Sequence, residues 1–150
     1  MEVFQEFATK YNNSEEVEKT TESEIQKLES EFDIYLPDDY KIFLLNFGNL
    51  WTPDILDIIV DNELDLNDVQ QFWDVESIIF DKKNEFTSQM SIDMIPFASD
   101  CMGSIFGFLT FDLKEKKENC AVYFFDHDLE KVKKISNSFT EWIDNFNRIQ

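Results

Sequence analysis

The sequence contains a single histidine, so a catalytic triad or a cysteine–histidine pair in this chain would have to use it. His127 lies between Asp126 and Asp128, and Cys120 precedes it by seven positions. Two carboxylates and an imidazole could ligate a metal, but in this order they are more typical of a polar turn. No nucleophile motif surrounds Cys120. We therefore expect neither an enzyme nor a metal site here, and a hydrolase that pairs Cys120 or Cys101 with His127 is the third alternative.

Acidic residues crowd the segment that follows residue 50 and could bind a cation. An EF-hand calcium loop has Gly at its sixth position and Glu at its twelfth. Counted from Asp61, these positions hold Leu66 and Phe72, so the sequence does not match this motif. No set of cysteines and histidines has zinc-binding spacing. The sequence therefore predicts no metal and no cofactor, which leaves these acids either as a surface that binds a partner or as a solvated rim.

The whole chain is strongly acidic, with 13 Lys and Arg against 32 Asp and Glu and a net charge of −19. Such a chain repels nucleic acid and anionic membranes and attracts a basic protein. Two tryptophans within the acidic segment could anchor an interface. The candidate partner-binding residues are Trp51, Asp54, Asp57, Asp61, Glu63, Asp65, Asp68 and Trp73. The alternative is that both tryptophans belong to the core and the acids form a solvated rim that keeps the protein soluble.

Length and composition predict a single domain over 1–150, with 1–20 as an N-terminal helix and loop extension and 21–150 as the core. The apolar share is 43% and 16 residues are Phe, which argues against disorder and predicts a Phe-rich core. Cys101 and Cys120 are expected to be buried thiols, because two cysteines make no disulfide framework. The first residues do not resemble a signal peptide and no stretch could span a bilayer, so we expect a cytoplasmic protein. The oligomeric state stays open.

The most regular stretch is a short helix that begins at Pro37 and ends before Gly48. Its large apolar residues recur at helical spacing and should face the core; they are Tyr40, Phe43, Leu44 and Phe47. The polar residues Asp38, Asp39 and Lys41 then remain free to meet a partner. Two more helices are expected before it, over 3–11 and 22–32. The second begins with a capping box at Thr21 and Glu24, and it should pack against the regular helix as a hairpin.

The remaining elements are expected in an order that changes from helices to strands. They are a strand over 55–60, an acidic loop or strand edge over 61–68, a helix over 75–86, a polar surface segment over 87–93, strands over 94–98, 104–112, 121–126 and 132–135, and a helix from Ser138. This order predicts an α+β fold, in which a mostly antiparallel sheet is flanked by N-terminal helices and a C-terminal helix. Pro96 favours an edge or a strand end.

Four stretches, taken together and in this order, resemble the SUKH superfamily, the Smi/Knr-type domain. They are 24–29, then 36–44 with Gly48, then 95–100 with Gly103 and 106–108, and finally 122–128 with 138–143. The resemblance covers most of the chain from about residue 20 and is weaker over 50–93.

This resemblance implies a protein-binding function. Many bacterial members resemble immunity proteins that bind a secreted polymorphic toxin, often a nuclease or deaminase, and block its active site or substrate surface. The implied partner is a cognate toxin domain, basic if it binds nucleic acid. Other members are regulatory interaction domains, so an intracellular regulatory or scaffold module of the same fold is the alternative. The family implies no active site.

Overall fold

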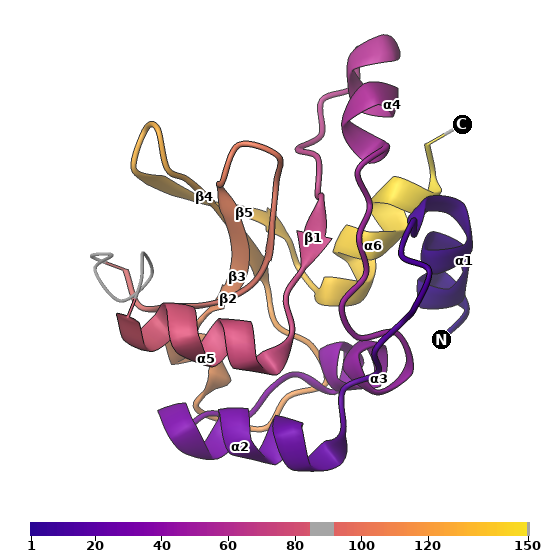
Figure 1. Cartoon of the computed structure of the whole chain (residues 1–150). Coiled ribbons are helices and arrows are strands. Elements are labelled where there is room, and N and C mark those ends of the chain that lie inside the picture. The colour runs from indigo at the N-terminus through magenta and orange to yellow at the C-terminus, as the bar shows by residue number, and fades with distance from the viewer. Residues whose placement is uncertain (85–91, 150) are drawn as a thin grey trace.

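The computed structural model describes residues 1–84 and 92–149, which form six α-helices and a five-stranded antiparallel sheet (Figure 1). The helices are α1 (Glu2–Tyr11), α2 (Glu22–Phe32), α3 (Asp38–Asn46), α4 (Ile55–Asp61), α5 (Val75–Asn84) and α6 (Phe139–Asn147). The strands are β1 (Gln71–Phe72), β2 (Met94–Ser99), β3 (Ile105–Leu109), β4 (Val122–Asp126) and β5 (Lys131–Ser136), and they lie in this order across the sheet. The predicted α+β fold is confirmed. The end of the helix predicted over 75–86 and most of the segment predicted over 87–93 lie outside the described residues.

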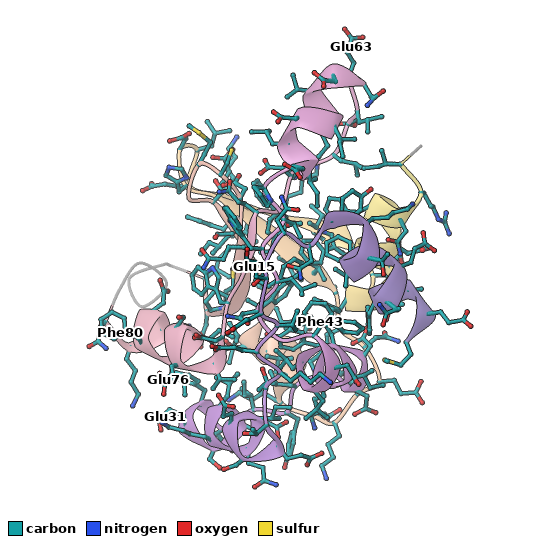
Figure 2. The ribbon with its side chains drawn as sticks, turned by 45° about the vertical axis from the view of Figure 1, so that its right-hand side comes forward. Glu15, Glu31, Phe43, Glu63, Glu76 and Phe80 are labelled. Atoms are coloured by element: carbon teal, nitrogen blue, oxygen red, sulfur yellow. The ribbon has the colours of Figure 1, made fainter. Side chains whose placement is uncertain are left out.

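Helix α3 supplies the centre of the core, as its spacing predicts. Phe43 is fully buried and its ring meets those of Phe4, Phe72 and Phe139 at centroid distances of 5.0 to 5.5 Å (Figure 2). Gly48 ends the helix with φ +65, and a Cβ there would lie 1.8 Å from the carbonyl oxygen of Glu18. Only glycine fits this position, because both its backbone conformation and its close backbone neighbour exclude a side chain.

Helix α1 is built into the same core, although the sequence suggested an extension. Phe4 and Phe7 are buried, and α1 lies along α6 in Figure 1. The Tyr11 hydroxyl donates to the carbonyl of Phe146 at 2.6 Å. The Asn147 amide in turn donates to the carbonyl of Val3 at 2.9 Å. The N-terminal and C-terminal helices therefore close the fold together.

Helix α2 has the predicted capping box, in which Thr21 accepts from the Glu24 N–H and Glu24 accepts from the Thr21 N–H. It lies mainly along α5, however, and not as a hairpin with α3 (Figure 1). Two side chains of α3 that were expected to be free are engaged. Asp39 accepts from both the N–H and the hydroxyl of Thr140 at 3.0 Å, and Lys41 pairs with Glu29 at 3.3 Å.

The strand predicted over 55–60 is wrong, because this segment forms α4. Ile55 and Ile59 are buried four residues apart while Asp57 and Val60 are exposed, which is a helical pattern. In a strand, Asp57 would share a face with both isoleucines. The strand predicted over 104–112 is central in the sheet as expected, but it ends at Leu109.

Two other differences concern the sheet. The residues that follow β3, Thr110–Leu113, form a 3-10 helix, so Phe111 is 84% exposed. Pro96 was expected at an edge or a strand end, but it lies inside β2 opposite Gly107, next to a shift in the register between β2 and β3. A strand irregularity of this kind accommodates a residue that has no N–H to donate.

Candidate functional site

The predicted partner-binding acids lie on a projecting arm, which we define as residues 54–65 and call the acidic arm. It consists of α4 and the turn after it, and it stands away from the sheet at the top of Figure 1. Its five carboxylates are exposed; they belong to Asp54, Asp57, Asp61, Glu63 and Asp65. Among the described residues, none of the five pairs with a lysine or arginine. The arm therefore presents uncompensated negative charge.

Two features of the arm work against its own stability. Asp61 places a negative charge at the C-terminal end of α4, where the helix dipole is already negative. Glu63, at the tip in Figure 2, has φ +53, a left-handed conformation that a residue with a Cβ adopts at a cost. Val60 is 63% exposed beside these acids. Strained acidic residues and exposed apolar groups at such positions are typical of binding surfaces.

Two more of the candidate partner-binding residues, Trp51 and Asp68, lie at the base of the arm. Trp51 is 45% exposed, and its backbone N–H donates to the side-chain oxygen of Asn12 at 3.2 Å. Trp51 therefore lies at the surface and not in the core. Asp68 is 8% exposed, and its carboxylate accepts from the Cys101 N–H at 3.2 Å. It ties the chain after the arm to the β2–β3 turn, so its side chain is not part of the exposed acidic surface.

Trp73 lies apart from the arm, in a groove between β1 and α5. The residue is half-buried, and its indole N–H donates to the Ser99 hydroxyl at 3.2 Å. The groove has a volume of about 690 Å³ and is also lined by Asp74, Glu76 and Phe80. Sequence reasoning did not single out these three residues. The sequence could have indicated two of them, because Glu76 and Phe80 are four residues apart and therefore share one face of a helix.

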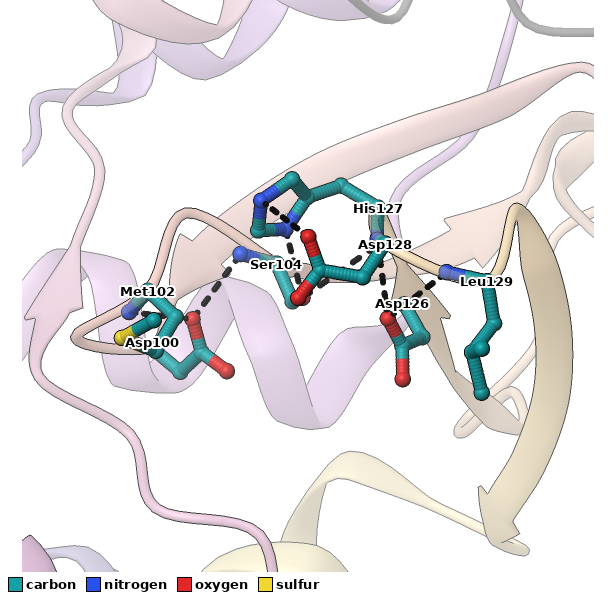
Figure 3. A network of polar contacts seen from close by, with 7 residues as sticks. All are labelled: Asp100, Met102, Ser104, Asp126, His127, Asp128 and Leu129. Atoms are coloured by element: carbon teal, nitrogen blue, oxygen red, sulfur yellow. Dashed lines mark hydrogen bonds and ion pairs between the residues drawn. The ribbon is translucent and has the colours of Figure 1, made fainter.

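The histidine belongs to a polar network that joins two turns (Figure 3). Its Nδ1 lies 3.0 Å from the Ser104 hydroxyl, and its Nε2 lies 3.3 Å from a carboxylate oxygen of Asp128. The same three residue types form a catalytic triad, but there Nε2 faces the serine and Nδ1 faces the aspartate, which is the reverse of the arrangement here. The Ser104 hydroxyl also accepts from the His127 N–H at 3.3 Å. Ser104 is 4% exposed. A buried hydroxyl that joins the two turns is a structural link between them and is poorly placed to attack a substrate.

Neither cysteine has the environment of a nucleophile. Cys120 is buried as expected, and burial raises the pKa of its thiol to about 11. Cys101 was expected to be buried but is exposed. Its pKa is also raised, first by desolvation and then by the carboxylates of Asp68 and Asp100. Both thiols are held in the protonated form, which is the opposite of what nucleophilic catalysis needs.

In residues 1–84 and 92–149, no group of three or more His, Cys, Asp or Glu side chains is arranged to hold a metal ion. No helix in those two ranges combines the length and the apolar character needed to cross a membrane.

Comparison with known families gives one result that spans most of the chain. The model described as the SMI1 / KNR4 family (SUKH-1) matches residues 19–145. The match contains α2 to α6 and all five strands except the last two residues of α6, so it includes the acidic arm and the groove. Helix α1 lies outside it. No curated protein matches the chain.

Proposed function

Because the chain belongs to the SMI1 / KNR4 family (SUKH-1), we propose that it is an immunity protein that binds a cognate toxin domain in the cytoplasm and neutralises it. In this proposal the protein acts by binding and not as an enzyme. It covers the active site or the substrate surface of the toxin. The family is consistent with this function.

One structural observation supports the proposal most strongly. The acidic arm projects five exposed carboxylates, and in the part of the chain that the structure describes no lysine or arginine is paired with them. Exposed Val60 within the arm and exposed Trp51 at its base are apolar groups that can be buried on binding. A rim of charge around a few apolar anchors is the usual composition of a specific protein interface.

The charge of the chain suggests which toxin it binds. With a net charge of −19, the protein attracts a basic partner over a distance of about a Debye length, roughly 10 Å at 0.1 M salt. Toxins that act on nucleic acid carry basic surfaces because they bind phosphate. A toxin of this class is therefore the proposed partner, and the acidic arm would occupy the surface that the toxin uses for nucleic acid.

Co-expression with a candidate toxin domain, chosen from the genes beside the one for this protein, tests the proposal. We expect host cells to survive with both proteins and to die with the toxin alone. Survival should be lost when the arm carries Asp57→Asn, Asp61→Asn and Glu63→Gln, and retained with Glu2→Gln, Glu22→Gln and Glu115→Gln, which remove the same charge elsewhere. If cells die equally with and without the protein, it does not neutralise that toxin, and a regulatory or scaffold module becomes the better explanation.

A further inference from the structure

We propose that the groove between β1 and α5 is a second binding site, and that it takes an arginine side chain carried on an exposed segment of a basic protein. The groove is on a different part of the molecule from the acidic arm. Figure 2 shows Glu76 and Phe80 along α5, far from Glu63 at the tip of α4. The binding site itself does not depend on the proposed function. The proposed function is needed only to identify the basic protein as the toxin.

The charge of the groove selects a cation. Three carboxylates line it, those of Asp74, Glu76 and Asp81, and no lysine, arginine or histidine is among the described residues that line it. Asp74 caps α5 by accepting from the Ser77 N–H at 2.8 Å. Because the Asp74 carboxylate already places a negative charge at the start of α5, it disfavours an anion there. Glu76 is exposed and adds its charge in the first turn of the same helix.

The aromatic groups of the groove favour arginine over a simple cation. Phe80 is 56% exposed and lies in the groove wall together with half-buried Trp73. A guanidinium can stack on an aromatic face while it donates to a carboxylate, whereas an ammonium is a more strongly hydrated point charge. A large exposed phenylalanine beside acidic groups has no evident role in the stability of the fold. Burial against a bound partner would explain its exposure.

The size of the groove fits a short segment of chain. Its volume of about 690 Å³ is within the range of roughly 300–1,000 Å³ that is usual for ligand sites. It is therefore larger than one guanidinium requires. The neutral side chains of Gln71, Ser77 and Ser99 also line it, and they can hydrogen-bond the backbone on either side of the arginine.

A peptide titration followed by NMR tests this site in the full-length protein. The probe is acetyl-Gly-Arg-Gly-Arg-Gly-amide, and the control is the same peptide with citrulline, which keeps the shape of arginine without its charge. We expect the arginine peptide to shift the Trp73 indole N–H signal, assigned with Trp73→Phe, and the citrulline peptide to leave it unchanged. The signals of Trp142, in the core, and Trp51, at the base of the acidic arm, should not move.

Paired variants identify the groups that bind the probe. Glu76→Gln and Phe80→Ala should each weaken binding roughly two- to fivefold, the loss expected for one exposed charge or cation–π contact. Glu22→Gln, in the first turn of α2, and Phe111→Ala, at another exposed phenylalanine, should bind like the unchanged protein. The proposal is wrong if the Trp73 signal does not move at millimolar peptide, if both peptides act alike, or if only residues of the arm respond. Any of these results leaves the co-expression test of neutralisation unaffected.

Discussion

At the scale of single residues, two buried tyrosines differ in what their hydroxyl groups contact. The Tyr11 hydroxyl donates to the Phe146 carbonyl at 2.6 Å. The Tyr40 hydroxyl is buried without a hydrogen-bond partner among the described residues, and the Tyr40 ring packs against Phe97, Phe108 and Phe139. Burial raises the pKa of Tyr40 far above its ordinary value, so the group remains a neutral, unsatisfied donor.

We expect opposite effects when each hydroxyl is removed. Tyr40→Phe should raise the free energy of unfolding by about 1 kcal/mol, because a desolvated donor without a partner is lost. Tyr11→Phe should lower it by about 1 kcal/mol, because it removes a buried hydrogen bond. Urea unfolding followed by tryptophan fluorescence measures both. A destabilised Tyr40→Phe protein would mean that the hydroxyl does have a partner.

Asp68 predicts a pH dependence of stability. Burial raises the pKa of its carboxyl above the ordinary value, although the Cys101 N–H opposes this shift. The folded protein thus holds this proton to a higher pH than the unfolded chain. The group therefore favours folding fully below its ordinary pKa and loses this contribution as the pH rises through its folded-state pKa. Asp68→Asn mimics the neutral form, so it should be more stable than the unchanged protein at pH 7.

The advantage of Asp68→Asn should shrink as the pH falls through the raised folded-state pKa of Asp68, where the native carboxyl gains its proton. Urea unfolding at a series of pH values measures this difference. The control is Asp57→Asn, which removes one charge from an exposed position of the acidic arm. Equal effects of the two substitutions at every pH would show that burial of Asp68 is not the cause.

At the scale of elements, the end of α3 depends on the lack of a side chain at Gly48. Gly48→Ala should lower the free energy of unfolding by about 3 kcal/mol or more, since the new Cβ meets the Glu18 carbonyl and φ is positive. Gly103 also has a positive φ, +91, but a Cβ there would have the His127 Cε1 atom at 3.9 Å as its nearest neighbour. Gly103→Ala should therefore cost only about 1 kcal/mol, for the backbone alone. Equal costs would show that the contact with Glu18 can relax.

Elements with a complete local signal could be predicted from the sequence. Helices α2 and α6 combine an apolar stripe with a side-chain N-cap, and α3 combines one with the stop at Gly48; the structure confirms all three helices. Helix α4 could not be predicted, because its branched residues favour a strand locally and only the burial of Ile55 and Ile59 shows the helical period. The end of β3 was also missed, since Phe111 is as apolar as the strand residues before it but is not covered by any layer.

The candidate site could be predicted only in part, for the same reason. The cluster of acids in the sequence predicted the five carboxylates of the arm, because charged groups that are close in sequence remain close on a short helix. Asp68 looks the same in sequence, and only its contact with Cys101 in the β2–β3 turn buries it. The groove is formed where β1 meets α5, so no local pattern contains it.

At the scale of the whole molecule, the net charge of −19 should control how fast the partner is found. Because salt screens attraction between separated charges, the association rate constant with a basic toxin domain should fall about tenfold or more between 0.05 and 0.5 M salt. The dissociation rate constant should change less. Stopped-flow fluorescence measures the association rate. A rate that is flat across this range would show that steering by charge is not part of the mechanism.

Binding of the toxin through the acidic arm is tested most directly by the affinity of the toxin domain for two charge-matched variants. One carries Asp57→Lys, Asp61→Lys and Glu63→Lys on the arm, and the other carries Glu2→Lys, Glu22→Lys and Glu115→Lys elsewhere. Both change the net charge equally, so any difference between them reports the location of the interface. We expect the arm variant to bind at least about tenfold more weakly than the control variant. Equal affinities would contradict the claim and place the interface on another face of the protein.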